Sequence, residues 1–217
     1  MQLHTETVTP LLMNALIRLM NEPLFKPFRL VGGTNLSLRL GHRKSVDLDL
    51  FTDCQYGSLD FGLFEKFLEN AFPYFDCPDR SAVVSFGKSY YVGLSADECF
   101  KLDLMYTDTF FDKAESIEGI RMASTEQIAA MKMEALNNGG RKKDWWDVHE
   151  LLTMFSLKQL MDLHKKWQPW THDPGKLLEK LVDFDEADTQ PDPVCLKGKL
   201  WDFIKMDMID AVSELNA

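Results

Sequence analysis

The sequence predicts an α+β fold, with strands and helices mixed in the first part and helices alone in the second. Short segments of alternating apolar and polar residues recur up to about residue 122, separated by amphipathic segments. After that point apolar residues recur at helical spacing, and strand patterns stop. The hydrophobic fraction of 45% and the charged fraction of 27% are ordinary for a globular chain. We therefore expect two parts within the 217 residues, 1–122 and 123–217.

Each element of the first part is predicted from its own pattern. Residues 9–21 are expected to be helical, because Thr9 can cap a helix that begins at Pro10. Two further helices are expected over 34–40 and 60–72. Strands are expected, the last three of them as a meander, over 28–31, 46–51, 82–86, 90–94 and 99–105.

The second part shows helix start signals. Ser124 and Gln127 form the pattern of a capping box, which predicts a helix to about Leu136. Another helix is expected from near Asp144 to about Phe155, and further amphipathic segments follow. This part is therefore expected to be a set of helices.

Charge and composition limit the function classes. The formal net charge of −10 opposes non-specific binding to a phosphate backbone, so nucleic-acid binding would need a local basic patch. Arg141-Lys142-Lys143 fits either such a patch or a solvated loop. The sequence shows neither a membrane span nor a secretory signal. The four cysteines are scattered without a CxxC pair, so we expect reduced thiols in a cytoplasmic protein.

Two aspartates in the strand over 46–51 are the first candidates for chemistry. Asp47 and Asp49 alternate with apolar residues, so the period of two places both carboxylates on one face. Carboxylates fixed side by side repel each other unless a cation lies between them, and Mg²⁺ prefers such oxygen ligands. A strand with a solvated acidic face is the common alternative.

Two further features favour a nucleotide site. Gly32-Gly33-Thr34 joins a strand to a helix, where backbone N–H groups can approach phosphate oxygens. A third acid, Asp103, lies in another alternating strand. If the two strands are neighbours, Asp103 can act as a general base or as a further metal ligand beside the first two carboxylates.

These motifs resemble a known family. The segment GGTNLSLRLGHRKSVDLDLF, with the later lone Asp in a strand, is similar to the polymerase-β-like nucleotidyltransferases. In detail it resembles the AbiEii branch, which contains toxins of abortive-infection and toxin–antitoxin systems. Residues 124–152, STEQIAAMKMEALNNGGRKKDWWDVHELL, are similar to the helical signature of that branch. Together the matching motifs span residues 30–152.

The resemblance implies a polymerase-β-like fold, with a small mixed sheet flanked by helices and a helical C-terminal part. Residues 1–122 would be the catalytic domain, and 123–217 would close the nucleotide site. Asp47 and Asp49 would hold Mg²⁺ or Mn²⁺, and Asp103 would be the base or third ligand. The triphosphate would be contacted by Gly32, Gly33 and Thr34, with Arg43 and Ser45 bracing the site.

In the second part, the resemblance implies that Lys132 reaches the nucleotide and that Asp144 completes the pocket, with Asp147 as a weaker candidate. From spacing alone, Lys132 lies at the rim of an apolar stripe without an acidic partner three or four residues away, so a solvated lysine fits equally well. Asp144 also fits the N-cap of its helix. The neighbouring pair Trp145-Trp146 fits either base stacking or core packing.

We therefore expect an active toxin that moves a nucleoside monophosphate from an NTP to a hydroxyl acceptor. tRNA or another RNA end is the leading acceptor, and a cognate antitoxin is the expected protein partner. A protein or a small molecule such as an aminoglycoside is the alternative acceptor. A catalytically inactive nucleotide-binding or partner-binding module of the same fold is the alternative function.

Overall fold

The computed structural model describes residues 2–78 and 86–216. The chain forms two compact units. The first, here called the sheet unit, consists of Met1–Arg39 and Ser45–Ala123, and the second, the helical unit, consists of Leu40–Lys44 and Ser124–Ala217. None of the helices in the described part of the chain combines the length and the apolar character that a membrane span requires.

The sheet unit contains one mixed sheet, whose seven strands among the described residues follow the order β3-β4-β5-β2-β1-β7-β6. Strand β2 runs parallel to β5, and β1 runs parallel to β7, while the other neighbours are antiparallel. The strands are β1 (Arg29–Leu30), β2 (Leu48–Thr52), β3 (Tyr74–Asp76), β4 (Gly87–Gly93), β5 (Cys99–Tyr106), β6 (Glu115–Ile117) and β7 (Ile120–Met122).

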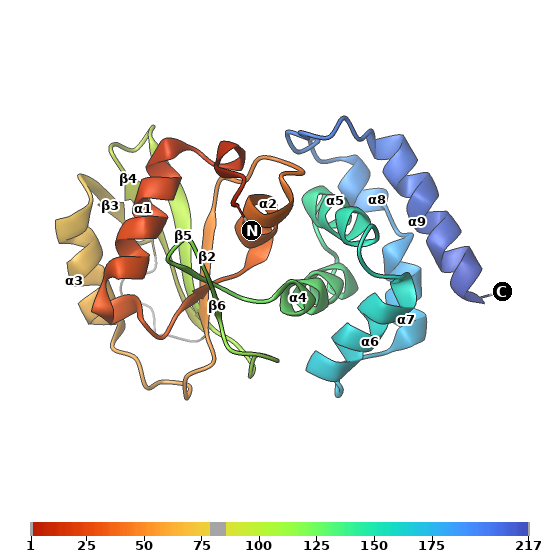
Figure 1. Cartoon of the computed structure of the whole chain (residues 1–217), viewed down its shortest axis with the longest axis horizontal. Helices are drawn as coiled ribbons and strands as arrows, with labels where there is room; N and C mark the ends of the chain where they lie inside the picture. The colour runs from red at the N-terminus through yellow and green to blue at the C-terminus, as the bar shows by residue number, and fades with distance from the viewer. Residues whose placement is uncertain (1, 79–85, 217) are drawn as a thin grey trace. The chain divides into compact units, whose positions relative to one another are not determined.

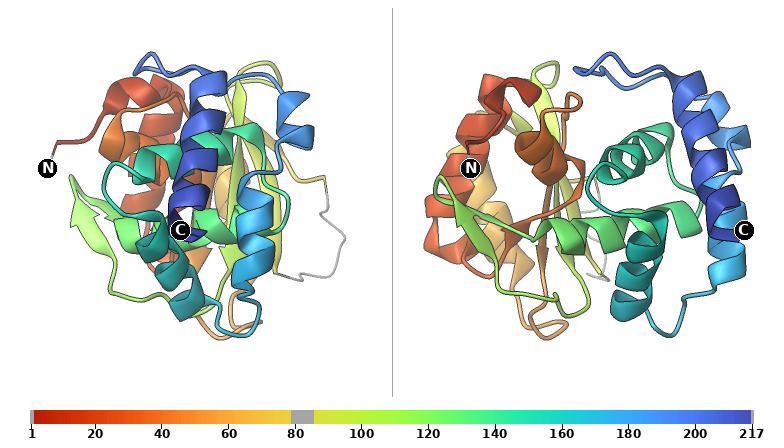
Figure 2. Two further views of the ribbon diagram at one scale, coloured as in Figure 1. Left: turned by 90° about the vertical axis from the view of Figure 1, so that its right-hand side faces the viewer. Right: turned by 45° about the vertical axis from the view of Figure 1, so that its right-hand side comes forward.

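Helices α1 (Pro10–Asn21) and α3 (Phe61–Ala71) cover one face of the sheet, as Figures 1 and 2 show. Their buried residues form a core with the apolar residues that alternate along β2, β4 and β5. Thr9 caps α1 through its side chain, as predicted. The other set of alternating side chains on β2 and β5, which includes the aspartates, therefore lies on the opposite face.

Helix α2 (Gly32–Leu40) follows β1 directly. Two short 3₁₀ turns lie near α1. Thr5–Thr7 precedes this helix, and Pro23–Phe25 lies between it and β1. Asn35 on α2 donates to the carbonyl oxygens of Leu30 and Ala123, which ties the helix to the ends of β1 and β7. The position of the first residues of α2 is thereby fixed relative to the sheet.

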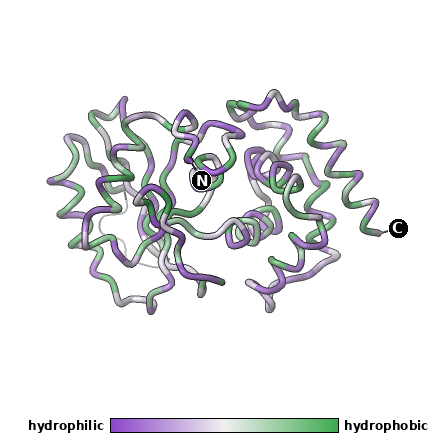
Figure 3. Tube along the Cα trace, viewed as in Figure 1, coloured by the Kyte–Doolittle hydropathy of each residue, from purple (hydrophilic) through white to green (hydrophobic). Residues whose placement is uncertain are grey.

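The helical unit is built around α4 (Thr125–Asn137), which packs against α5 (Lys142–Leu151), α6 (Leu157–Trp167) and α7 (Pro174–Leu181). The short α8 (Asp185–Asp188) and the C-terminal α9 (Trp201–Asn216) complete it. Figure 2 shows α7 and α9 side by side. The chain alternates over short distances between hydrophilic and hydrophobic residues in both units, consistent with one buried face per element (Figure 3).

Three tryptophans form the centre of the helical unit. Trp146 stacks on Trp201 with ring centroids 5.7 Å apart and planes 10° apart. Trp145 packs edge-on against Trp201 and donates its indole N–H to the carbonyl of Leu181 at 3.0 Å. Both Trp145 and Trp146 are therefore core residues, which decides between the two uses that the sequence left open.

The predicted α+β class is confirmed, and the differences are local. The hairpin of β6 and β7 and the edge strand β3 were not predicted. The strand expected over 82–86 falls mainly on residues 82–85, outside the described residues. The helix expected from near Asp144 to about Phe155 runs from Lys142 to Leu151. It ends before Phe155 because Ser156 caps a separate helix, α6, through a capping box with Gln159.

Candidate active site

The two aspartate strands are neighbours in the sheet. The parallel pairing of β2 with β5 sets Asp49 directly beside Asp103. Extending the same register by one residue places Asp47, which precedes Leu48, level with Lys101, which precedes Leu102. The expected adjacency of the strands is confirmed, and the three carboxylates share one face of the sheet with a lysine.

Asp103 is held by two donors. The hydroxyl of Ser89 on β4 donates to Oδ1 at 2.6 Å, and the ammonium of Lys101 donates to Oδ2 at 2.7 Å. Burial lowers the pKa of Lys101, but the hydrogen bond and charge of Asp103, together with the charges of Asp49 and Asp47, raise it above its ordinary value. All three carboxylates therefore act on one ammonium. Lys101 was not predicted as a site residue.

The carboxylates offer the hard oxygen donors that Mg²⁺ or Mn²⁺ prefers. In the described part of the chain, however, no three His, Cys, Asp or Glu side chains are already arranged as a group that could hold a metal ion. The donor chemistry of Asp47, Asp49 and Asp103 thus fits a divalent cation, whereas in this structure Asp103 is bound by the ammonium of Lys101.

The start of α2 is shaped around Asp49. Gly32 has a φ of +67°, and a Cβ atom at this residue would lie 2.1 Å from Oδ2 of Asp49. Glycine is therefore required both for the backbone conformation and for the space that the carboxylate occupies. Gly33 follows as the second residue of the helix, where N–H groups lack helical partners and favour negative charge.

Thr34 and Ser45 brace the polar strand from inside the sheet unit. Thr34 is 1% exposed, and its hydroxyl lies at hydrogen-bonding distance from the hydroxyl of Ser45 and from the carbonyl oxygen of Asp47. Because the carbonyl can only accept, Thr34 donates to it and accepts from Ser45. The resemblance implied that Thr34 contacts the triphosphate. In this structure the hydroxyl of Thr34 is buried and holds the carbonyl of Asp47, and contact of Thr34 with the triphosphate stays a prediction.

A second charged cluster lies in the helical unit. The ammonium of Lys132 on α4 lies 2.6 Å from Oδ1 of Asp144 and 2.7 Å from Oδ2 of Asp147, both on α5. Lys132 is 7% exposed. The solvated lysine that spacing alone allowed is therefore wrong, because the acidic partners of Lys132 lie 12 and 15 residues away on the next helix rather than at helical spacing.

Arg43 also differs from its expected place. Its guanidinium forks onto Asp147, with Nε donating to Oδ1 and Nη2 to Oδ2, both at 2.7 Å. His42 adds a third hydrogen bond to the same carboxylate at 2.7 Å. Arg43 was expected to brace the metal and phosphate, but it belongs to the helical unit and is buried against Asp147, with its third nitrogen, Nη1, donating to the backbone of Lys44.

These ion pairs shift the pKa values of the buried groups. Burial raises the pKa of Asp147, but Arg43, Lys132 and His42 outweigh it and hold the value well below the usual range. Burial raises the pKa of Asp144, as does the charge of Asp147, but the charge and hydrogen bond of Lys132 together with the backbone N–H of Arg141 give a net lowering. The pKa of Lys132 is lowered by burial and raised by the two carboxylates, with a net rise. All three groups are therefore charged near neutral pH.

Asp144 has a further structural use. Its Oδ2 accepts the backbone N–H of Arg141 at 2.9 Å at the start of α5. Asp144 is thus the third residue of the helix and caps its N-terminus from within, rather than being the N-cap itself. The same carboxylate binds Lys132 with its other oxygen, Oδ1, so the helix cap and the ion pair together hold the Asp144 side chain in one orientation.

The run Arg141-Lys142-Lys143, which fitted either a basic patch or a solvated loop, is only partly exposed in the structure. Lys142 is 5% exposed, and its ammonium lies 3.0 Å from Asp192 and above the ring of Trp201. Lys142 is therefore part of the packing of the helical unit rather than of a basic surface.

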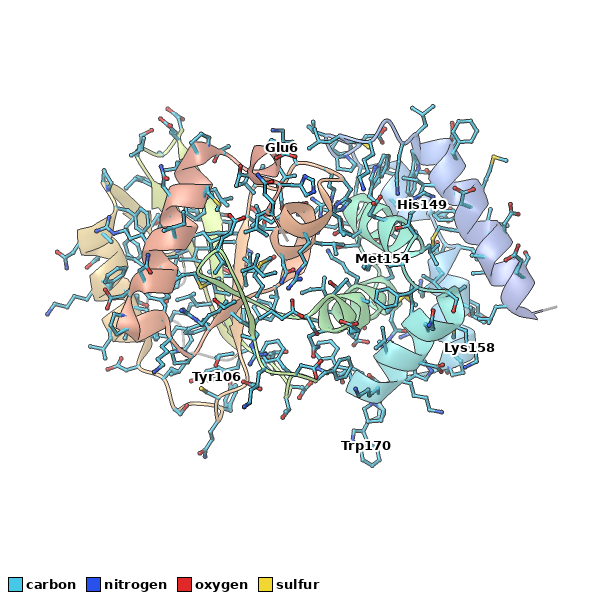
Figure 4. All side chains as sticks on the ribbon, viewed as in Figure 1. Glu6, Tyr106, His149, Met154, Lys158 and Trp170 are labelled. Carbon is cyan, nitrogen blue, oxygen red and sulfur yellow. The ribbon has the colours of Figure 1, made fainter. Side chains whose placement is uncertain are left out.

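A groove of about 610 Å³ lies elsewhere in the helical unit, between the end of α5, the start of α6 and α9. His149 and Lys158, labelled in Figure 4, are among the residues that line it. None of the predicted site residues does so. The candidate residues therefore form two groups outside this groove, the carboxylates of the sheet unit and the Lys132 cluster of the helical unit.

Three similar proteins each match most of the length of this chain. Protein aq_aa25 of Aquifex aeolicus (strain VF5) is 30% identical over 184 residues, which cover 80% of this chain and 81% of that protein. Among solved structures, a candidate nucleotidyltransferase from Helicobacter pylori superposes with a TM-score of 0.60 at 21% identity, covering 93% of this chain and 92% of that one. The nucleotidyltransferase toxin MenT4, Rv2826c of Mycobacterium tuberculosis H37Rv, superposes with a TM-score of 0.55 at 13% identity, covering 88% and 76%.

The structural likenesses, both under 25% identity, show a shared fold alone. The family model described as "Nucleotidyl transferase AbiEii toxin, Type IV TA system" matches residues 14–215. That match includes both the carboxylate strands and the Lys132 cluster. The chain therefore belongs to the AbiEii family of nucleotidyltransferase toxins.

Proposed function

We propose that this nucleotidyltransferase moves a nucleoside monophosphate from an NTP to a hydroxyl group, with Asp47, Asp49 and Asp103 holding Mg²⁺ or Mn²⁺. The observation that supports the proposal is the pairing of β2 with β5, which sets Asp49 beside Asp103 on the face that also carries Asp47. When bound, the cation would neutralise phosphate charge and lower the pKa of the attacking hydroxyl.

The residues of the sheet unit would bind and orient the substrates. Gly33, at the start of α2, would offer its backbone N–H to phosphate oxygens, which helix N-termini favour. Asp103 would accept the proton of the attacking hydroxyl. Gly32 makes room for Asp49, and Thr34 with Ser45 holds the segment before β2.

For the helical part, we propose that Lys132 offsets phosphate charge during the reaction. Asp144 and Asp147 would hold its ammonium, and Arg43 would act through Asp147 as a positioning residue. By resemblance to the family, residues 1–122 would be the catalytic domain and 123–217 the part that closes the nucleotide site.

tRNA or another RNA end is the acceptor that we propose first, with a cognate antitoxin as the protein that opposes the toxin. One observation favours a second candidate, a protein hydroxyl or a small molecule. The net charge is −10, and Lys142 of the predicted basic patch is buried and paired with Asp192. A polyanionic acceptor would gain little from such a surface.

The proposal is tested by measuring transfer of the labelled nucleoside monophosphate from an α-labelled NTP to an acceptor. The full chain is incubated with each α-labelled NTP and Mg²⁺ or Mn²⁺, together with total RNA or with cell extract depleted of RNA. We expect labelled RNA, and a loss on the order of a hundredfold or more in Asp49→Asn. Asp76→Asn, at an exposed residue of the edge strand β3 that β4 separates from β5, makes the same charge change and should retain wild-type labelling.

Each other outcome has a defined meaning. Label in a protein or small-molecule fraction alone would replace RNA with the second class of acceptor. Equal labelling by wild type and Asp49→Asn would overturn the role of the carboxylates. A folded wild-type protein that labels nothing in any fraction would mean that the chain is an inactive member of its family.

A further inference from the structure

A cation that the family motifs do not include lies among the carboxylates. Lys101 is two residues before Asp103 on β5, so both side chains leave the same face of the sheet. Its ammonium donates to Asp103 at 2.7 Å, and the charges of Asp49 and Asp47 act on it as well. The Lys101 side chain is 36% exposed, so the ammonium can leave the carboxylates without moving the sheet.

The electrostatics of the sheet explain why a cation lies there. Like charges directly opposite on neighbouring strands repel each other, and Asp49 is opposite Asp103. Ser89 and Lys101 together occupy both oxygens of Asp103 and so fix its orientation. Lys101 brings one positive charge to Asp103, and Asp49 lies directly beside that carboxylate on the neighbouring strand. A divalent cation that is bound by both carboxylates would bring two charges to the same place and would compete with the ammonium for Asp103.

We propose that Lys101 is the internal counter-ion of this site, which holds Asp103 in place in the metal-free protein and yields its position when a divalent cation binds. The inference rests on the proposed function, since it takes Asp47, Asp49 and Asp103 as the metal ligands. Lys101 is thus a positioning residue that competes with the metal. The affinity for the metal is reduced by the fraction of molecules in which the ammonium occupies the carboxylates.

An ordinary cross-strand ion pair would behave differently. If Lys101 only supported the sheet, its removal would lower stability and leave the affinity for metal unchanged. If it competes with the metal, removing it lowers the stability of the metal-free protein but strengthens metal binding. The opposite signs of these two effects separate the two roles.

The experiment measures the affinity for Mn²⁺ by isothermal titration calorimetry and the melting temperature with and without Mn²⁺. We expect Lys101→Met to melt lower than wild type without metal and to bind Mn²⁺ at least about fivefold more tightly. Lys101→Arg keeps the charge and should bind like wild type to within about twofold. Lys66→Met, an exposed lysine of α3, makes the same charge change elsewhere on the sheet unit and should change neither quantity.

The failure of this inference differs from the failure of the metal site. A wild-type protein that binds Mn²⁺ with the same affinity as Lys101→Met overturns the counter-ion role and leaves the metal site intact. Binding by Lys101→Met alone supports the inference in its strongest form. Absence of binding in every folded variant overturns the inference and the assignment of the three carboxylates as ligands together.

Discussion

At the scale of single residues, Lys132 decides how the helical unit must be tested. It is buried between Asp144 and Asp147, so it cannot be treated as a surface lysine whose replacement leaves stability unchanged. Removing one partner of a buried ion pair strands the other charge, at a cost of roughly 3–5 kcal/mol. A loss of activity in a Lys132 variant is therefore informative only when stability is measured beside it.

We predict that Lys132→Met lowers the free energy of unfolding by about 3 kcal/mol or more and lowers nucleotide transfer on the order of a hundredfold. Urea unfolding and α-label transfer at a temperature where the variant is folded measure the two effects. The double variant Lys132→Met/Asp144→Asn should recover part of the stability, because it removes one stranded charge, without recovering activity. Stability within about half a kcal/mol of wild type would contradict the buried ion pair.

The same cluster predicts how stability depends on pH. The pKa values of Asp147 and Asp144 lie below the unfolded value of 3.8, so their stabilisation is complete above about pH 4 and is lost as the pH falls through the folded values. The pKa of Lys132 is raised above 10.5, so its stabilisation is complete below that pH and is lost as the pH rises through the folded value. The cluster should therefore be fully effective between these limits.

In Asp147→Asn, we expect the slope of the unfolding free energy against pH below pH 4 to fall by up to about 1.4 kcal/mol per pH unit, the value for one proton. Urea titrations at several acidic pH values provide the slopes. An unchanged acid slope would mean that Asp147 has an ordinary pKa in the folded protein.

At the scale of elements, the turn from β1 into α2 joins backbone conformation to chemistry. Gly32 has a positive φ, and the carboxylate of Asp49 fills the space beside it. Gly32→Ala therefore adds backbone strain and also displaces a proposed metal ligand. Gly57 has a φ of +77° with nothing within 4 Å of an added Cβ, so Gly57→Ala supplies the strain alone.

We predict that Gly57→Ala costs about 1–3 kcal/mol of stability and keeps wild-type transfer activity where the protein is folded. Gly32→Ala should cost more than Gly57→Ala and should abolish most of the activity, because the Cβ and the Asp49 carboxylate cannot occupy the same space. Chemical denaturation and label transfer provide the comparison. Equal effects of the two substitutions on stability and activity would show that Asp49 moves aside without consequence.

Elements also show how far sequence reasoning reaches. Alternation alone predicted that Asp47 and Asp49 share a face, because strands impose a period of two. That Asp103 joins them depended on its strand being the neighbour, which the sequence left open and the pairing of β2 with β5 settles. The same rule places Lys101 on the face of Asp103, so the alternation along β5 also indicates that Lys101 lies beside the carboxylates. The hairpin of β6 and β7 was missed because its strands have three residues each, too short for a pattern, although Gly119 marks its turn with a φ of +82°.

At the scale of the whole molecule, ion pairs between residues far apart in the sequence could not be predicted from the sequence. Arg43 and Asp147 are separated by 104 residues, and only the fold brings them together. Segment Leu40–Lys44 therefore belongs with the helical unit, although it begins at the last residue of α2 and precedes β2 of the sheet unit. The same limit applies to Lys132, since helical spacing describes neighbours on one helix and cannot reveal a partner on the next.

The tryptophan cluster described above lies in the helical unit alone, so the two units differ in their intrinsic chromophores. The chain has five tryptophans and five tyrosines. Every tryptophan lies in Ser124–Ala217, and every tyrosine lies in Ser45–Ala123. Light absorbed selectively by indole therefore reports on the helical unit alone, and the phenol signal reports on the sheet unit alone. Ligand binding and melting can thus be followed unit by unit in the unmodified protein, with no dye or inserted fluorophore.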